Sequence, residues 1–270
     1  MKSKKLKKWT TLLTCATALT VMTACSQSSS QSTGTTSSTT SKTSAVTATT
    51  SKKTNKNNSN YFTSKDSDTS YDESSASKIK LSGSSADVSG DGVAVSGSTV
   101  TISKAGTYVI SGKSDGVQIK VDAGDSDDVH IVLDGVTMTN TNAAINATSA
   151  GHVYLTLKDG TTSTLSDSSS NSDEDADAVI FSKGDLTING SGTLNIDAKK
   201  NNGIKANDSL HMTGGTYKIT SVGDAFNVND ELNITGTTMT IKAGDDGIHA
   251  SGDLIIDSGT YKVEKSTEGI

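Results

Sequence analysis

Residues 202–223 read NGIKANDSLHMTGGTYKITSVG, and the same pattern returns in residues 224–245 (DAFNVNDELNITGTTMTIKAGD) and 246–267 (DGIHASGDLIIDSGTYKVEKST). Each 22-residue repeat contains three apolar pairs whose members are two residues apart, as in Ile248/Ala250, Leu254/Ile256 and Tyr261/Val263. Alternation with a spacing of two indicates short strands with one buried face. Three such strands per repeat, joined by turns rich in Gly, Asp, Asn and Ser, predict one triangular rung of an all-β parallel β-helix with three sheets.

The rung length fits this fold. A strand rises roughly 3.3 Å per residue, so 22 residues give a perimeter of about 70 Å, which suits three strands and three turns around a filled core. Successive rungs would stack about 4.8 Å apart. Residues that are 22 positions apart should therefore lie above one another and form ladders along the solenoid.

The pattern continues upstream with less regular spacing. Val179 aligns with Ile204, and Val129 recurs as Val153 after 24 residues. The acidic stretch 166–177, SDSSSNSDEDAD, interrupts the pattern and is expected to bulge from the solenoid. We expect residues 78–128 to form a β-rich cap and the first rungs, and residues 129–270 to form the β-helix. An open rung exposes strand edges, so we also expect the chain to continue beyond Ile270.

Other repeat folds fit less well. A leucine-rich repeat has a similar period but needs an L-x-x-L-x-L core, and a calcium-binding nonapeptide roll needs a nine-residue period. Neither pattern is present in the sequence. A hexapeptide helix would repeat at multiples of six, and the observed period of 22 residues is not one of them. A β-sandwich has evenly spaced strands, but it gives no reason for an identical spacing over three repeats.

The first 24 residues resemble an export signal. Five lysines precede an apolar stretch, TLLTCATALTVMTA, that is too short for a comfortable membrane span. The stretch ends in small residues before Cys25, as in the lipobox of bacterial lipoproteins, and this resemblance implies cleavage and lipid attachment at Cys25. No Cys follows it, so a disulfide within the mature chain is excluded. The alternative is an ordinary secretory signal in which Cys25 has no role.

Residues 25–77 are mostly Ser, Thr, Lys and Asn. Such a segment buries too little apolar surface to offset its ordering entropy, so a disordered tether is expected. Together with Cys25, it predicts a protein held by a lipid anchor at the extracellular face of the bacterial membrane.

The charge balance excludes one class of partner. Removing residues 1–24 takes away five lysines and no acids, so the formal net charge falls from −6 to −11. Arg is absent from the sequence and aromatic residues make up 4% of it. These features argue against nucleic-acid binding.

An acid or amide, a small residue and an apolar residue precede the first strand of each rung. The series is Asp177-Ala178-Val179, Asn202-Gly203-Ile204, Asp224-Ala225-Phe226, Asp246-Gly247-Ile248 and Glu268-Gly269-Ile270, with Asp245 adjoining it. Two carboxylates about 4.8 Å apart repel by roughly 1 kcal/mol in water and about 3.5 kcal/mol at an effective dielectric of 20. A row of them favours a bound cation, and Ca²⁺ accepts six to eight oxygen ligands in flexible geometry. The candidate ligands are Asp177, Asn202, Asp224, Asp245, Asp246 and Glu268. The alternative is that Asp, Asn and Gly are good turn formers on a solvated corner.

Residues between the inward-facing ones should point outward. On the first strand they are Ile180, Lys205, Asn227 and His249, and on the third they include Lys218 and Lys262. Lys205, His249, Lys218 and Lys262 are candidate contacts to a hydroxyl- and carboxylate-bearing polymer. The alternative for each is an ordinary solvated side chain.

The chain from about Ala86 onward resembles the bacterial secreted carbohydrate-binding domain-containing proteins. The resemblance rests on ADVSGDGVAVSGSTVTISKAGTYVISG, VLDGVTM and AVIFSKGDLTINGSGTL, and on the repeated DGI-type turn with TGGTYKIT and IDSGTYKV. It implies a right-handed parallel β-helix and calcium-dependent binding of plant cell-wall polysaccharide, notably polygalacturonate and also cellulose. The calcium role carries over to Asp224 and Asp246, and then to Asp177 and Glu268. The sequence departs from the usual D-D-G-I turn at Asn201-Asn202 and at Gly223-Asp224-Ala225, which leaves the number of cations open.

Two other functions remain open at this stage. Pectin lyases and hydrolases share this architecture, but a lyase of this type usually uses an Arg base, which is absent here, and a hydrolase needs two opposed carboxylates. A purely structural surface rod would bind no sugar. We therefore predict a binding protein rather than an enzyme.

Overall fold

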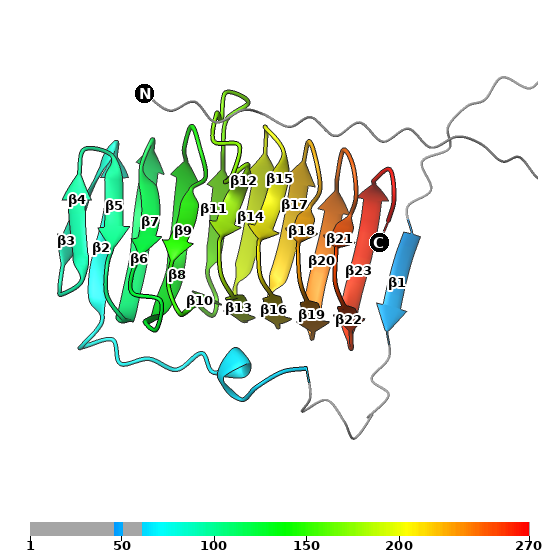
Figure 1. The fold of residues 1–270 in the computed structure, drawn as a ribbon, viewed down its shortest axis with the longest axis horizontal. Coiled ribbons are helices and arrows are strands. Elements are labelled where there is room, and N and C mark those ends of the chain that lie inside the picture. The colour runs from blue at the N-terminus through cyan, green and yellow to red at the C-terminus, as the bar shows by residue number, and fades with distance from the viewer. Residues whose placement is uncertain (1–45, 51–60, 270) are drawn as a thin grey trace, which may run out of the picture. The chain divides into compact units, whose positions relative to one another are not determined.

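The computed structural model describes residues 46–50 and 61–269, and all of them belong to one compact unit. This unit is a parallel β-solenoid, as the repeat predicted (Figure 1). The predicted signal sequence, Cys25 and the remainder of the predicted tether lie outside the described residues. No helix among the described residues has the length and apolar character needed to cross a bilayer.

The first face is an eight-stranded sheet. Its strands are β4 (Val93–Ser96), β5 (Thr99–Ile102), β7 (Gln118–Asp122), β9 (Ile145–Ser149), β12 (Ala178–Ser182), β15 (Asn202–Ala206), β18 (Phe226–Val228) and β21 (Ile248–Ala250). All neighbours in this sheet are parallel except β4 and β5, which pair antiparallel at its beginning.

The second and third faces belong to a single sheet, because the long strand β8 (Asp128–Thr139) contributes to both. The second face continues with β10 (His152–Leu157), β13 (Leu186–Gly190), β16 (Leu210–Thr213), β19 (Leu232–Thr235) and β22 (Leu254–Ile256). The third continues with β11 (Thr162–Ser166), β14 (Thr193–Ala198), β17 (Thr216–Ser221), β20 (Thr237–Lys242) and β23 (Gly259–Lys265). At the start of the solenoid, β6 (Gly106–Asp115) pairs with β8, and β2 (Ser77–Gly83) pairs with both β6 and β3 (Ser85–Ser89).

The 22-residue register is confirmed from Ile204 onward. Ile204 pairs with Phe226 and Phe226 with Ile248, while on the third face Tyr217 pairs with Met239 and Met239 with Tyr261. Side chains at these positions point into one continuous apolar core. The two tyrosines are buried in it.

The predicted alignment of Val179 with Ile204 was wrong by one residue. The structure pairs Ile180 with Ile204 and Ala178 with Asn202. Ile180 therefore lies in the core, although it was predicted to point outward. Phe181 takes the outward place and packs in a small cluster with Ala143 and Ala176. Ala176 belongs to the loop between β11 and β12, which projects from the solenoid (Figure 1). Val179 and Ile180 are both apolar, so alternation alone could not fix the register here.

The prediction of a disordered tether up to Ser77 needs correction. Residues 46–50 form strand β1 (Val46–Thr50), which pairs antiparallel with β23. Residues 61–76, here called the strap, run along the second face and include the 3-10 turn η2 (Lys65–Ser67) (Figure 1). The low apolar content of the strap predicts disorder. It is held instead by hydrogen bonds from polar side chains of the second face, for example from Asn233 to the carbonyl of Tyr61.

Candidate functional site

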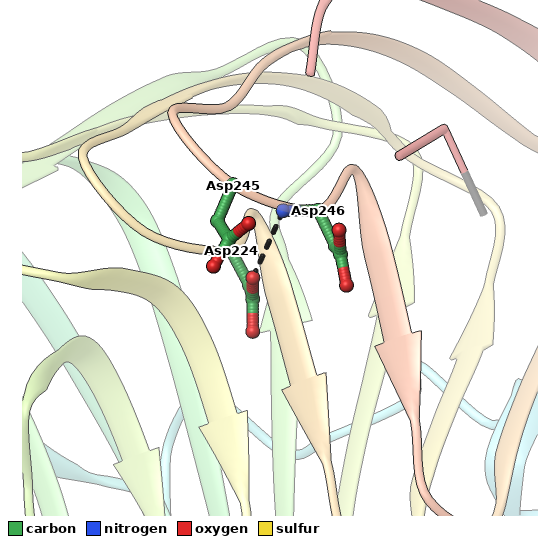
Figure 2. Close-up of side chains that lie close together, drawn as sticks. All are labelled: Asp224, Asp245 and Asp246. Atoms are coloured by element: carbon green, nitrogen blue, oxygen red, sulfur yellow. Dashed lines mark hydrogen bonds between the residues drawn. The ribbon is translucent and has the colours of Figure 1, made fainter. Parts of the chain in front are cut away.

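Three carboxylates converge at the corner where the chain passes from the third face to the first. Asp224 precedes β18, and Asp245 and Asp246 precede β21 in the next rung. One carboxylate oxygen from each lies within 4.8 Å of the others. Figure 2 shows the three side chains gathered at this corner. The predicted stacking of Asp224 and Asp246 on one corner is therefore confirmed.

Hydrogen bonds between successive rungs hold these side chains in place. The backbone N–H of Asp224 donates to Asn202 Oδ1 (3.1 Å), and the backbone N–H of Asp246 donates in turn to Asp224 Oδ1 (3.0 Å; Figure 2). Asn227 Nδ2 donates to Asp224 Oδ2 (2.7 Å). Asp224 is only 8% exposed, whereas Asp245 is open to solvent. A carboxylate has about four acceptor positions, so Asp224 keeps lone pairs for a cation beside these two donors.

Close stacking of the turns requires a glycine before Asp245. A Cβ atom at Gly244 would lie 1.9 Å from the carbonyl oxygen of Val222 in the preceding rung. The N–H of Gly244 also donates to the carbonyls of Ser221 (3.0 Å) and Gly223 (3.2 Å). The missing side chain thus lets the turn that carries Asp245 and Asp246 approach the turn that carries Asp224.

The other three predicted ligands lie outside this triad. Asp177 Oδ1 is 2.7 Å from Lys205 Nζ, so a lysine already neutralises this acid. Asn202 Oδ1 accepts a hydrogen bond from the N–H of Asp224, so Asn202 supports the triad without being one of its three carboxylates. Glu268 continues the ladder through its backbone carbonyl, which accepts from Gly247, but its exposed side chain does not join the group.

The predicted sugar contacts lie on both faces that meet at this corner. Lys205, Asn227 and His249 form one ladder on the first face, and His249 Nδ1 lies 3.5 Å from Asp246 Oδ2. Lys218 and Lys262 belong to a ladder on the third face, with Thr240 between them.

The third-face ladder borders a shallow hollow. Its lining includes Lys218, Thr240, Lys242 and Glu264, and Glu264 pairs with Lys262 at 2.7 Å. This ion pair holds the pKa of Glu264 below its ordinary value. The corner is therefore acidic, while the two adjoining faces carry amines, hydroxyls and an imidazole.

This arrangement suits a hard cation. Carboxylate oxygens are preferred ligands of Ca²⁺. Three negative charges within 4.8 Å repel by about 1 kcal/mol per pair in water and about 3.5 kcal/mol per pair at an effective dielectric of 20. A bound divalent ion would remove this repulsion. The residues present therefore fit a hard divalent cation, which Asp224, Asp245 and Asp246 would hold.

Sequence reasoning missed the part that Asn227 plays. Asn227 was placed correctly in the outward ladder between Lys205 and His249, but its amide turns back to Asp224 instead of facing only solvent. Its position three residues after Asp224 was the available signal. An Asn at that spacing can reach the side chain that precedes the strand.

Comparison with known proteins agrees with the fold. Residues 96–270 match the family described as carbohydrate-binding domain-containing proteins. The chain belongs to this family. The resemblance noted in the sequence is therefore confirmed.

Two similar proteins extend this finding. A carbohydrate-binding domain-containing protein of Acetivibrio thermocellus is 39% identical over 123 residues, which are 43% of this chain and 43% of that protein. The match thus spans less than half the length of this relative. A solved structure, described as a polysaccharide lyase-like protein from C. thermocellum in a gadolinium derivative, has a TM-score of 0.57 at 27% identity. The similarity covers 72% of this chain and all of that one.

Proposed function

We propose that this member of the family binds acidic polysaccharide, with polygalacturonate as the ligand, through calcium held by Asp224, Asp245 and Asp246. The observation that carries the proposal is the convergence of three carboxylates within 4.8 Å at one corner. In a strongly acidic chain, an anionic polymer would otherwise be repelled. Bound calcium would neutralise the corner and offer its remaining coordination positions to carboxylate and hydroxyl oxygens.

The side chains around the corner have distinct parts in this proposal. Asp224 is fixed by its two hydrogen bonds and supplies a preorganised ligand. Asp245 and Asp246 complete the carboxylate set. His249 and Lys218, on the two adjoining faces, are placed to contact the polymer on either side of the ion.

The related solved structure supports a hard-cation site. That protein is described as a gadolinium derivative. Gadolinium forms a hard trivalent ion, so it shares with calcium a preference for oxygen ligands. A protein with a similar fold was thus crystallised with a hard ion, and a hard ion is what we propose for the corner of this chain.

Calorimetric titration tests the proposal. The full chain is titrated with Ca²⁺ and then with trigalacturonate, and cellotriose serves as the neutral control. Trigalacturonate should bind far more tightly in the presence of calcium than in chelator. Asp224→Asn should weaken both the ion and the sugar, whereas Lys218→Gln should weaken the sugar alone. Equal binding of trigalacturonate in calcium and in chelator would reject calcium as the bridge.

The second candidate is a polysaccharide lyase. It is favoured by one observation, the description of the similar solved structure as lyase-like. Incubation with polygalacturonate and calcium distinguishes the two functions. Unsaturated chain ends would establish a lyase, and binding without new ends supports the binding protein. Absence of both outcomes would leave a structural surface rod.

The location of the protein is a further part of the proposal. We propose attachment to the outer face of the bacterial membrane through a lipid on Cys25, which lies outside the described residues. Metabolic labelling with a fatty acid should mark the natural protein and fail to mark a Cys25→Ser variant. Equal labelling of the two proteins would reject the anchor.

A further inference from the structure

The strap covers a polar part of the second face. Its first residue, Tyr61, lies over β19, η2 lies over β13 and β16, and Tyr71 contacts His130 of β8 edge-on. It therefore crosses several rungs in the direction opposite to their order in the chain (Figure 1). Three of the four histidines of the sequence, His130, His152 and His211, are on this face.

Asp66 is the centre of this contact. Its carboxylate is 2% exposed, and Oδ1 accepts a hydrogen bond from the hydroxyl of Thr187 (2.7 Å). His211 Nδ1 lies 3.3 Å from the same oxygen without hydrogen-bonding alignment, so its attraction is electrostatic. Oδ2 accepts from the N–H (2.7 Å) and hydroxyl (2.9 Å) of Thr63, within the strap itself. The second face thus contains a built site for one carboxylate.

The rest of the contact has the same chemistry, in which the face donates and the strap accepts. Thr213 Oγ1 donates to the backbone carbonyl of Asp66 (2.6 Å), and Asn189 Nδ2 donates to the carbonyls of Asp66 (3.2 Å) and Asp68 (3.0 Å). Asn233 Nδ2 donates to the carbonyl of Tyr61 (3.0 Å). A row of donors beside a carboxylate site matches a ligand that is rich in oxygen acceptors.

The strap does not satisfy this face completely. Within the part of the chain that the structure describes, His211 Nδ1 and Asn233 Oδ1 are buried side-chain atoms without a hydrogen-bond partner, and both lie under the strap. Buried polar atoms normally find partners, and each one left alone is unfavourable. If the strap left, water would take its place at Thr187, Asn189 and Thr213. The strap is therefore suited to exchange with another ligand.

An aromatic pair adjoins the carboxylate site. His152 and Tyr154 stack at 4.1 Å between ring centroids and 15° between planes. Lys65 of the strap lies over the Tyr154 ring at 4.7 Å and also pairs with Asp128. Departure of the strap would uncover the tyrosine ring, which offers a flat surface to a sugar ring beside the donor row.

We propose that the second face between β10 and β19 is an additional binding site for an extended acidic glycan, and that the strap occupies this site as an internal substitute for the ligand. A uronate carboxylate would take the place of the Asp66 carboxylate at Thr187 and His211. Ring and hydroxyl oxygens of the next sugars would take the places of the backbone carbonyls at Asn189 and Thr213. This site needs no metal, so it is separate from the calcium corner.

Charge on this face modulates the exchange. The neighbouring Asp66 carboxylate raises the pKa of His211, and Glu231 and Asp185 act in the same direction. Burial lowers the pKa of His130, which faces Asp68 and Lys65. Burial also lowers the pKa of His152, which faces Asp185, Asp66, Asp128 and His211.

The pKa of Asp66 shifts in the opposite direction from that of His211. Burial acts to raise the pKa of Asp66, but His211 and the hydroxyl and amide donors outweigh it and hold the value well below the ordinary range. The pair is thus strongest when His211 is protonated and Asp66 is ionised.

Full-length variants test the proposal in the presence of chelator, where the calcium corner cannot contribute. Asp66→Asn removes the charge with little change of shape, and Asp66→Lys places a cation against His211. Asp72→Asn is the control, because Asp72 is an exposed residue of the strap whose carboxylate accepts local hydrogen bonds from the N–H and hydroxyl of Ser74. Hydrogen exchange of residues 61–76 reports release of the strap, and titration with trigalacturonate reports the uncovered site.

Release of the strap and gain of binding should occur together. Because a charge-assisted bond is lost, strap amides in Asp66→Asn should exchange at least about tenfold faster than in the natural protein. Trigalacturonate should then bind at least about tenfold more tightly, and a second change, Thr187→Val, should abolish the gain. The control, Asp72→Asn, should match the natural protein in both the exchange of its strap amides and its affinity for trigalacturonate. A strap that opens without new binding overturns the proposal, as does a strap that stays protected in both Asp66 variants.

Discussion

Replacement of Asp224 by Asn separates the effect of calcium on the solenoid from the effect of the side chain itself. The substitution preserves shape, and the amide oxygen can still accept the Asp246 N–H. Loss of the charged acceptor for Asn227 costs about 1.5–3 kcal/mol. Removal of one of three carboxylates within 4.8 Å returns about 1 kcal/mol per pair in water and up to about 3.5 kcal/mol at an effective dielectric of 20.

These two effects nearly cancel when no cation is present. Solvent reaches Asp245 and, in part, Asp246, so the smaller repulsion applies to them. We therefore expect the variant to melt within about 4 °C of the natural protein in chelator, since 1 kcal/mol corresponds to about 2–4 °C for a domain of this size.

Calcium should raise the melting temperature of the natural protein more than that of Asp224→Asn. At a concentration one hundred times the dissociation constant, a ligand that binds only the folded state stabilises it by about 2.7 kcal/mol, and a tenfold weaker ligand by about 1.4 kcal/mol. The natural protein should gain about 5–10 °C in calcium, and Asp224→Asn about half of that.

Thermal unfolding in paired calcium and chelator samples measures both shifts. Asp253→Asn is the control, because Asp253 is an exposed acid at the corner between the first and second faces. Its response to calcium should equal that of the natural protein. If millimolar calcium leaves the melting temperature of the natural protein unchanged, or if Asp224→Asn gains as much as the control, the triad is not a calcium site.

Three further predictions concern the core, the corner and the strap. Phe226 is fully buried in the core, so Phe226→Ala should lower the free energy of unfolding by about 3–5 kcal/mol in urea titrations; a loss below about 1 kcal/mol would contradict the assigned packing. Gly244→Ala should cost about 1–3 kcal/mol and weaken calcium binding, because the new methyl group meets a backbone carbonyl, whereas Gly269→Ala meets nothing within 4 Å and should change neither property. The raised pKa of His211 means that its stabilisation of the strap is complete below its ordinary value of 6.5 and lost as the pH rises through the raised value; hydrogen exchange of residues 61–76, corrected for its intrinsic pH dependence, should accelerate over that range in the natural protein and not in His211→Ala.

Much of the fold was readable from the sequence because the repeat is both a local and a global signal. An apolar residue such as Phe226 indicates a strand by its alternation, and its spacing from Ile204 and Ile248 indicates which strands are neighbours. Few folds supply both kinds of information in one pattern. The register failed only where that redundancy was lost, at the adjacent apolar residues Val179 and Ile180 after an irregular loop.

The corner was predictable for the same reason, and the strap was not. Asp224 and Asp246 occupy equivalent places in successive repeats, so the fold itself brings them together. Asp66 precedes the solenoid and belongs to no repeat. Its partners, Thr187 and Thr213, occupy outward positions of their strands. Polar side chains at such positions are ordinarily expected to face solvent.

The reversed course of the strap has a consequence for folding. Asp66 meets Thr187 across 121 residues of sequence, and Tyr61 meets Asn233 across 172. Contacts between residues so far apart in the sequence form slowly, because the intervening chain must first be brought into place. During synthesis the strap emerges long before the strands that receive it, so it can be seated only after β13, β16 and β19 have formed. Seating of the strap is thus a late step of folding, and until then the donors of this face bind water.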